Sequence, residues 1–234
     1  MSIHQQPVNN STNNPLRIHA VETADGGKIG MTLCPGKIGL GRHCCWGRDL
    51  EADLAVIADW GADRVMTLME DHELLTYQVS DLGYRVRQRL GSNAWLHLPI
   101  VDMDIPDRRF EANWKRQGPA LHGILRTGGR ILVHCLGGLG RAGTIAARLL
   151  VETGVMPDAA IERVRQARHG AIESDSQAAY VRRLLDADAV IAQINRNPLA
   201  SRKLDETTAG AAGGLADSDT TVDTGGCSQR VKVQ

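Results

Sequence analysis

One stretch of the chain joins a cysteine to a glycine-rich loop and an arginine, a combination that could capture a phosphoryl group on sulfur. Residues 131–134 read I-L-V-H, Cys135 follows, and the loop that leads to Arg141 is rich in glycine. The apolar run predicts a strand buried on both faces, and the pattern after Arg141 predicts a helix. Ligands of such sheets bind beyond the carboxyl ends of the strands, where we expect Cys135 to lie.

The loop between Cys135 and Arg141 has the properties of an oxyanion cradle. Its glycines allow backbone conformations in which peptide N–H groups turn inward, and the positive end of the next helix points to the same place. These donors favour the thiolate of Cys135, while Arg141 supplies a planar fork for two phosphate oxygens. We expect His134 to anchor the loop by hydrogen bonds to its backbone. A buried structural cysteine in a tight turn is the alternative interpretation. The expected phosphate-binding residues are Leu136, Gly137, Gly138, Leu139, Gly140 and Arg141.

Composition limits the other classes of function. The 234 residues have a formal net charge of zero and 3% aromatic side chains, which argues against nucleic-acid binding and against an anionic membrane surface. No apolar run has the length of a transmembrane helix, and residues 1–15 lack the apolar core of a signal peptide, so we expect a cytoplasmic protein. The five cysteines are odd in number and irregularly spaced, which predicts free thiols.

Strand and helix patterns alternate along the chain, which predicts an α/β fold with a mostly parallel central sheet flanked by helices. We expect disordered tails at residues 1–15 and 198–234 around a single domain at residues 16–197. The expected strands span residues 29–33, 65–69, 95–100 and 131–134. The expected helices span residues 49–60, 74–90 (one or two helices), 108–125 (interrupted at 118–119), 144–153, 158–168 and 176–194.

The sequence around the cysteine resembles a known family. The pattern His134–Cys135–x–x–Gly138–x–Gly140–Arg141 resembles the signature of the cysteine-dependent protein tyrosine and dual-specificity phosphatases, and in particular the kinase-associated phosphatase (cyclin-dependent kinase inhibitor 3) group. Segments 35–40, 98–107 and 170–177 are similar to that group in the same order, so the resemblance covers residues 30 to 185. It implies a phosphatase-like fold, a phosphocysteine intermediate, a phosphorylated protein as substrate, and no cofactor or metal.

The resemblance also implies a general acid in the segment after the strand at 95–100. Asp102 occupies the position of the family's acid, and it directly follows an apolar strand that would bring it to the same sheet edge as Cys135. Asp104 is the alternative acid. Asp107 precedes a helical pattern and is better interpreted as an N-cap. A solvated acidic loop would explain all three residues without catalysis.

Two further positions bear on the second half of the implied reaction. Gln177 matches the family's glutamine that orients the hydrolytic water, although an exposed polar residue on a helix would look the same. Most members carry Ser or Thr directly after the arginine, whereas this chain has Ala142, as do the liver-regeneration phosphatases that it also resembles. Thr144 lies further along and is not expected to reach the cysteine. We therefore expect slow hydrolysis of the phosphoenzyme.

Several other motifs are interpreted as structural. The H-C-C run at 43–45 has poor spacing for a tetrahedral zinc site. The D-H-E run at 71–73 is interpreted as a solvated helix start, and the glycine-containing segment 36–41 as a turn. The basic run at 163–169 is interpreted as an exposed helix face, with contact to an acidic or phosphorylated partner as the alternative.

Two competing functions remain open. A phosphate-binding module with little turnover would explain Ala142 and the uncertain acid. A rhodanese-like sulfurtransferase also uses a loop cysteine, but it would leave the acidic segment and Gln177 unexplained. The absence of Lys and Arg from residues 136–140 argues against multiply phosphorylated inositol lipids as substrates.

Overall fold

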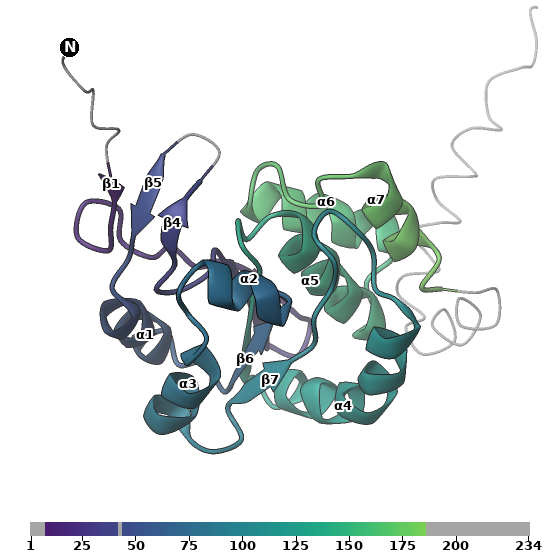
Figure 1. Ribbon diagram of the computed structural model, residues 1–234. Helices are drawn as coiled ribbons and strands as arrows, with labels where there is room; N and C mark the ends of the chain where they lie inside the picture. The colour runs from purple at the N-terminus through teal and green to yellow at the C-terminus, as the bar shows by residue number, and fades with distance from the viewer. Residues whose placement is uncertain (1–7, 42–43, 186–234) are drawn as a thin grey trace, which may run out of the picture. The chain divides into compact units, whose positions relative to one another are not determined.

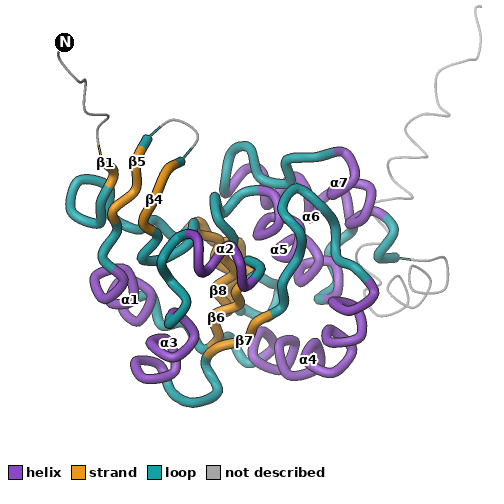
Figure 2. Tube along the Cα trace, viewed as in Figure 1, coloured by secondary structure: helices purple, strands orange, loops and turns teal. Residues whose placement is uncertain are grey.

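The central sheet brings the ends of several strands together at one edge. The computed structural model describes residues 8–41 and 44–185, and its larger sheet has five strands. Only the first pair in that sheet is antiparallel, and the other pairs are parallel, so the predicted α/β class with a mostly parallel sheet is confirmed (Figure 2). In spatial order the strands are β2 (His19–Glu22), β3 (Lys28–Thr32), β8 (Arg130–His134), β6 (Arg64–Thr67) and β7 (Trp95–His97).

Helices cover both faces of this sheet (Figure 1). One face packs on α1 (Leu50–Asp59) and α3 (Leu82–Leu90), and the other packs on α4 (Arg108–Arg126), α5 (Gly140–Glu152), α6 (Pro157–Ala167) and α7 (Asp175–Arg182). A short helix, α2 (Asp71–Thr76), follows β6. Side chains of β8 alternate between the two cores: Leu132 joins the α1 and α3 side, whereas Ile131 and Val133 join the other. None of the helices in the described part of the chain is long and apolar enough to cross a membrane.

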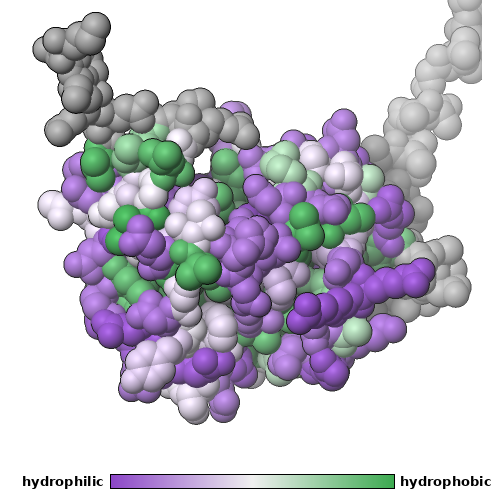
Figure 3. Space-filling view, in the orientation of Figure 1, coloured by the Kyte–Doolittle hydropathy of each residue, from purple (hydrophilic) through white to green (hydrophobic). Residues whose placement is uncertain are grey.

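A second, small sheet lies beside the first and includes part of the N-terminal segment. Its strands are β1 (Val8–Asn9), β5 (Cys45–Gly47) and β4 (Ile38–Leu40), in that order. The disordered tail predicted at residues 1–15 needs correction for residues 8–15: Val8 and Asn9 pair with β5, and the Asn14 N–H donates to the Asn10 carbonyl in the turn that follows. Figure 3 shows hydrophobic side chains gathered over this sheet, where Val8 and Leu40 are exposed.

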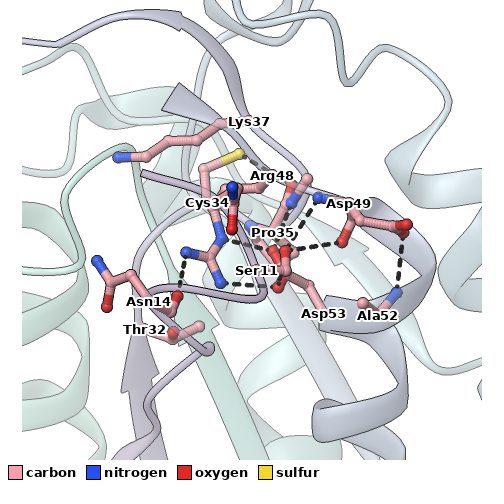
Figure 4. A network of polar contacts seen from close by, with 12 residues as sticks. Ser11, Asn14, Thr32, Cys34, Pro35, Lys37, Arg48, Asp49, Ala52 and Asp53 are labelled. Carbon is pink, nitrogen blue, oxygen red and sulfur yellow. Dashed lines mark hydrogen bonds and ion pairs between the residues drawn. The ribbon is translucent and has the colours of Figure 1, made fainter. Parts of the chain in front are cut away.

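A buried ion pair holds the N-terminal segment to α1 (Figure 4). The Arg48 guanidinium binds both carboxylate oxygens of Asp53 at 2.7 and 2.8 Å, and it also donates to the Asn14 carbonyl. The same carboxylate accepts hydrogen bonds from the Ser11 hydroxyl and from the Gly36 N–H, each at 2.9 Å. Both charges are thus removed from water only because each has a full set of partners.

Some element predictions need correction. The helix expected to break at residues 118–119 continues through Pro119, because its apolar face is buried and outweighs the single lost backbone hydrogen bond. The strand predicted at 95–100 ends at His97, although Leu98 and Ile100 still donate backbone hydrogen bonds to Thr67 and Leu68. Strands β2, β4 and β5 were not predicted. Residues 186–234, with the predicted tail at 198–234, lie outside the described residues, and the 16–197 domain stays a prediction.

We predict that Asp53→Asn lowers the free energy of unfolding by about 3–5 kcal/mol, because it leaves the Arg48 charge buried without a counter-charge. Glu51→Gln is the matched control, since Glu51 lies on the same helix as Asp53 and its exposed ion pair with Arg85 of α3 is expected to contribute little to stability. Urea unfolding followed by circular dichroism measures both values. Equal losses for the two variants would contradict the structural role given to Asp53.

Candidate active site

Cys135 lies directly after β8, at the carboxyl edge of the sheet. Its side chain is 3% exposed, and its Sγ atom accepts a hydrogen bond from the Gly138 N–H at 3.2 Å. Gly138 has a φ of +70°, and a Cβ atom there would lie 2.4 Å from the Thr32 carbonyl oxygen. Only glycine fits this position, and it lets the loop fold back over the sulfur.

The carbonyl groups of the loop are held on its outer side by two cations. Lys37 Nζ donates to the Leu136 carbonyl at 3.0 Å, and Arg168 donates to the carbonyls of Gly137, at 2.8 Å, and Gly138. In a trans peptide the N–H of the next residue points opposite to the carbonyl, so these contacts turn the N–H groups of residues 137–139 inward. The Gly138 N–H bond to the sulfur is one direct instance. The result is a nest of donors suited to an oxyanion.

A buried carboxylate fixes Arg141, whose charge interacts with Cys135. Its Nη1 and Nη2 atoms bind the two oxygens of Glu73 at 2.6 and 2.8 Å, and Nη1 also donates to the Ile100 carbonyl. Asp102 Oδ1 lies 2.8 Å from Nη2. The Nε atom is buried and has no hydrogen-bond partner in the described residues. The Nε–H edge of the guanidinium thus keeps a free donor, which an oxyanion could accept.

The Glu73–Arg141 pair stays ionised because each charge stabilises the other. Burial alone would raise the pKa of Glu73, but the hydrogen bond from Arg141 holds it below its ordinary value. Burial alone would lower the pKa of Arg141, but the hydrogen bond to Glu73 raises it above its ordinary value. The sequence pattern does not point to Glu73, since the run at 71–73 resembles a solvated helix start. The available signal was its spacing from Glu70, with which it forms a capping box on α2.

Of the three acidic candidates, Asp102 is the one that lies at the arginine. Its side chain is 59% exposed and it is followed by Met103, which has a φ of +62°. Asp104 instead accepts a hydrogen bond from the Ile105 N–H. Asp107 is the N-cap of α4 and accepts from the Phe110 N–H, as expected. Asp102 is therefore the aspartate of this segment that forms an ion pair with Arg141.

Gln177 and an unexpected glutamate lie beside the start of α5. Gln177 is fully buried; its amide oxygen accepts from the Ser174 N–H and its amide nitrogen donates to the Asp104 carbonyl. This side chain therefore links α7 to the acidic segment. Glu173 Oε2 accepts the Gly140 N–H at 2.8 Å, so one donor at the start of α5 already binds a carboxylate.

Ala142 and Thr144 follow the arginine on α5, and both are buried. The Thr144 hydroxyl donates to the Gly140 carbonyl at 2.8 Å, one turn earlier in the same helix. Its proton is therefore directed along the helix and away from the sulfur. Neither Ala142 nor Thr144 therefore supplies a hydroxyl proton to Cys135.

His134 ties the loop to the neighbouring strand. Its Nε2 atom lies 2.7 Å from the Thr67 hydroxyl, which also accepts from Trp95 Nε1 at 2.8 Å. Burial lowers the His134 pKa to about 3, although the Cys135 backbone acts in the opposite direction. A neutral ring is thus anchored through β6, and not mainly through the loop backbone as predicted.

The basic run at 163–169 is more than an exposed face. Arg163 donates to the Glu22 carbonyl, and Arg165 donates to the carbonyls of Ala171 and Ile172. Arg168 holds the cysteine loop as described above. Lys37, in the segment interpreted only as a turn, is 4% exposed, and its Nζ atom also lies 3.8 Å above the ring of Trp46. No local pattern indicates either loop contact, because both join residues far apart in the chain.

Comparisons with known proteins find similar phosphatases. A family model described as the DSP-PTPase phosphatase domain of a Swiss Army Knife protein matches residues 44–185. Cyclin-dependent kinase inhibitor 3 of Rattus norvegicus is 30% identical over 142 residues, which cover 59% of this chain and 65% of the relative. Protein tyrosine phosphatase type IVA 3 of Homo sapiens is 47% identical over 47 residues, or 20% of this chain and 27% of the relative. The matched segment spans less than two thirds of both relatives.

Solved structures are similar over most of the described chain. A kinase-associated phosphatase with serine in place of its catalytic-site cysteine superposes with a TM-score of 0.62 and 25% identity, over 72% of this chain and 93% of that one. A second structure, Tk-PTP in the active form, has a TM-score of 0.51 and 26% identity, over 71% of this chain and 95% of that one.

We predict that Glu73→Ala lowers the free energy of unfolding by about 3–5 kcal/mol, since it leaves the Arg141 charge buried. Asp102→Ala removes the other carboxylate bound to the same guanidinium, but one that is mostly exposed, so its cost is expected to stay below about 1 kcal/mol. Chemical denaturation of the wild type and the two variants gives the free energies of unfolding to be compared. The assignment of Glu73 as the residue that holds Arg141 fails if the two losses are the same.

Proposed function

Because the chain belongs to the DSP-PTPase family of phosphatase domains, we propose that it hydrolyses phosphate monoesters of proteins, at phosphotyrosine or at phosphoserine and phosphothreonine, through a phosphocysteine on Cys135. The observation that carries this proposal is the loop itself: Cys135 Sγ accepts the Gly138 N–H, and Arg141, whose charge interacts with Cys135, has an Nε donor without a partner in the described residues. These groups match an anionic phosphoryl group in both charge and hydrogen bonding.

In the first step the Cys135 thiolate attacks phosphorus. The S–P bond forms as the bond from phosphorus to the ester oxygen breaks, and Asp102 gives its proton to that leaving oxygen. The phosphoryl oxygens bind the N–H groups of the loop and Arg141. Arg141 Nη2 forms an ion pair with the Asp102 carboxylate, so an incoming phosphoryl group would take over that donor. The released, exposed carboxylate would then take up a proton from solvent, and this is the proton that it gives to the leaving oxygen.

In the second step water breaks the S–P bond. Asp102, now ionised, accepts a proton from the water as its oxygen attacks phosphorus, and inorganic phosphate leaves with Cys135 restored as a thiolate. Gln177 is the proposed group for orienting this water. Its place beside Gly140 supports that role, but its amide is also bound to the segment that carries Asp102. In the proposed second step, Gln177 and the segment that carries Asp102 therefore move together.

A low-turnover phosphate-binding module is the second candidate function, and two observations favour it. Glu173 occupies the Gly140 N–H with a negative charge, which would compete with a phosphoryl group at the same end of α5. Ala142 and the direction of the Thr144 hydroxyl leave the sulfur without a hydroxyl donor when the S–P bond breaks. Capture of phosphate and its slow release would follow.

We predict that the full chain hydrolyses a phosphotyrosyl peptide without added metal, and that Cys135→Ser abolishes this activity. Asp102→Asn should lower kcat by about a hundredfold, since it removes the proton donor, whereas Asp104→Asn should leave kcat nearly unchanged. The rate of inorganic phosphate release is measured for the wild type and the three variants. Equal, slow rates for the wild type and Cys135→Ser would support the binding module instead.

We predict that Ala142→Ser accelerates hydrolysis of the phosphoenzyme. In the wild type, rapid mixing with an aryl phosphate should give a burst of phenol equal to the enzyme concentration, because release from sulfur is slower than capture. The serine variant should show a higher steady-state rate and a smaller burst. Ala147→Ser, on the same buried helix, controls for the effect of a new hydroxyl. Absence of a burst in the wild type would overturn this expectation.

A further inference from the structure

Glu173 is a charged side chain at the cysteine loop that has no part in the catalytic steps given above. Its Oε2 atom accepts the Gly140 N–H at 2.8 Å, at the start of α5. The contact is close, because a Cβ atom on Gly140 would lie 2.6 Å from the same oxygen. Glu173 is nevertheless exposed, so a molecule bound at the loop can reach its carboxylate.

The backbone directly before Glu173 is held in one conformation. Ile172 has a φ of +58°, which is a genuine outlier for a β-branched residue and persists only where the surroundings impose it. Those surroundings are present: the Ile172 side chain is buried, its N–H donates to the Leu139 carbonyl, and Arg165 binds its carbonyl at 3.0 Å. The place of Glu173 beside the loop is therefore fixed by the fold.

Binding of a phosphoryl group would change the surroundings of this carboxylate. Gly140 is one of the residues whose N–H groups we expect to bind phosphoryl oxygens, so the phosphoryl group would take the donor that Glu173 now has. Glu173 would then lose a hydrogen bond and lie beside a second anion. Both changes are unfavourable unless a cation compensates them.

The cations of the loop are already engaged with other partners. Burial lowers the pKa of Arg168, while the nearby charges of Cys135 and Glu173 act in the opposite direction. The Arg168 guanidinium, however, donates to the carbonyls of Gly137 and Gly138. The lysine and the other arginine of the loop bind a carbonyl and a buried carboxylate, as described above. A cation on the ligand is therefore the best source of compensation.

Negative charge continues on the neighbouring side of the site. A groove of about 370 Å³ borders the segment that follows Asp102. Gln177 connects this segment to α7, because its amide donates to the Asp104 carbonyl. A peptide that crosses the site would thus meet carboxylates on two sides. The charged residues that line the groove are Glu70, Asp71, His72, Asp104, Asp107 and Arg109.

We propose that Glu173 determines specificity, by selecting phosphorylated segments that carry an arginine or lysine close to the phosphorylated residue. This inference rests on the phosphatase function given above. The phosphoryl group takes the Gly140 N–H, and the cation of the same segment binds the carboxylate that this N–H releases. Arginine is favoured over lysine, because its planar guanidinium donates two parallel hydrogen bonds to one carboxylate. The substrate class is thus a basic phosphorylated segment of a protein.

The test compares synthetic phosphotyrosyl peptides in which each residue near the phosphotyrosine is in turn arginine or glutamine. With the wild type, kcat/KM should be about tenfold higher for arginine than for glutamine at one of these positions, equivalent to about 1.4 kcal/mol. Glu173→Gln should remove this preference. The amide oxygen of the new side chain can still accept the Gly140 N–H, so this variant removes the charge and keeps the contact.

Asp175→Asn is the matched control, because Asp175 is an exposed carboxylate a short way along the chain, in the first turn of α7. This variant should retain the full preference for arginine. Loss of the preference here as well would indicate a general effect of charge and overturn the role of Glu173. A preference that survives in Glu173→Gln would also overturn it, and would assign the cation to the groove beside Asp102.

Binding to the full chain with Cys135→Ser separates this inference from the phosphatase function. Calorimetry should give about tenfold tighter binding for the best arginine peptide than for its glutamine counterpart, and an added Glu173→Gln change should remove that gain. If the wild type hydrolyses no peptide but this binding difference persists, the function fails and the assignment of Glu173 stands. If the wild type hydrolyses and binds all the peptides equally, the function stands and the assignment of Glu173 is overturned.

Discussion

The outward direction of three carbonyl groups in the cysteine loop is the constraint on which the site depends. Lys37 and Arg168 bind the carbonyls of Leu136, Gly137 and Gly138 from two different parts of the chain. With those oxygens outside, the planar peptides turn their N–H groups toward the sulfur. Removal of either cation would free a short glycine-rich segment whose backbone has many other conformations.

A single guanidinium connects three elements around this loop. Arg141 belongs to α5, its main partner Glu73 belongs to α2, and its second carboxylate, Asp102, belongs to the segment after β7. The buried partner fixes the orientation of the guanidinium, while the exposed partner can leave it when an anion arrives. The difference in burial between these two carboxylates distinguishes the structural role of Glu73 from the catalytic role proposed for Asp102.

Charged groups differ between the inner and the outer side of the cysteine loop, and this difference affects what binds and how fast it is released. The inner side of the loop offers donors to an anion, yet Glu173 already occupies the Gly140 N–H. On the outer side, Arg17, His19 and Arg168 line a cavity whose lining residues include no carboxylate. Local placement of charge therefore determines what binds, because the chain as a whole has a formal net charge of zero.

The sequence by itself determined the α/β class, the place of Cys135 after a buried strand and the proximity of Asp102 to the same sheet edge. Those features depend on local order and periodicity, which a single sequence contains. Only the tertiary structure decided that Glu73 holds Arg141, that Arg168 holds the loop and that β2 brings His19 beside it. These contacts join residues far apart in the chain, and their energy comes from burial and charge pairing, which no local pattern encodes.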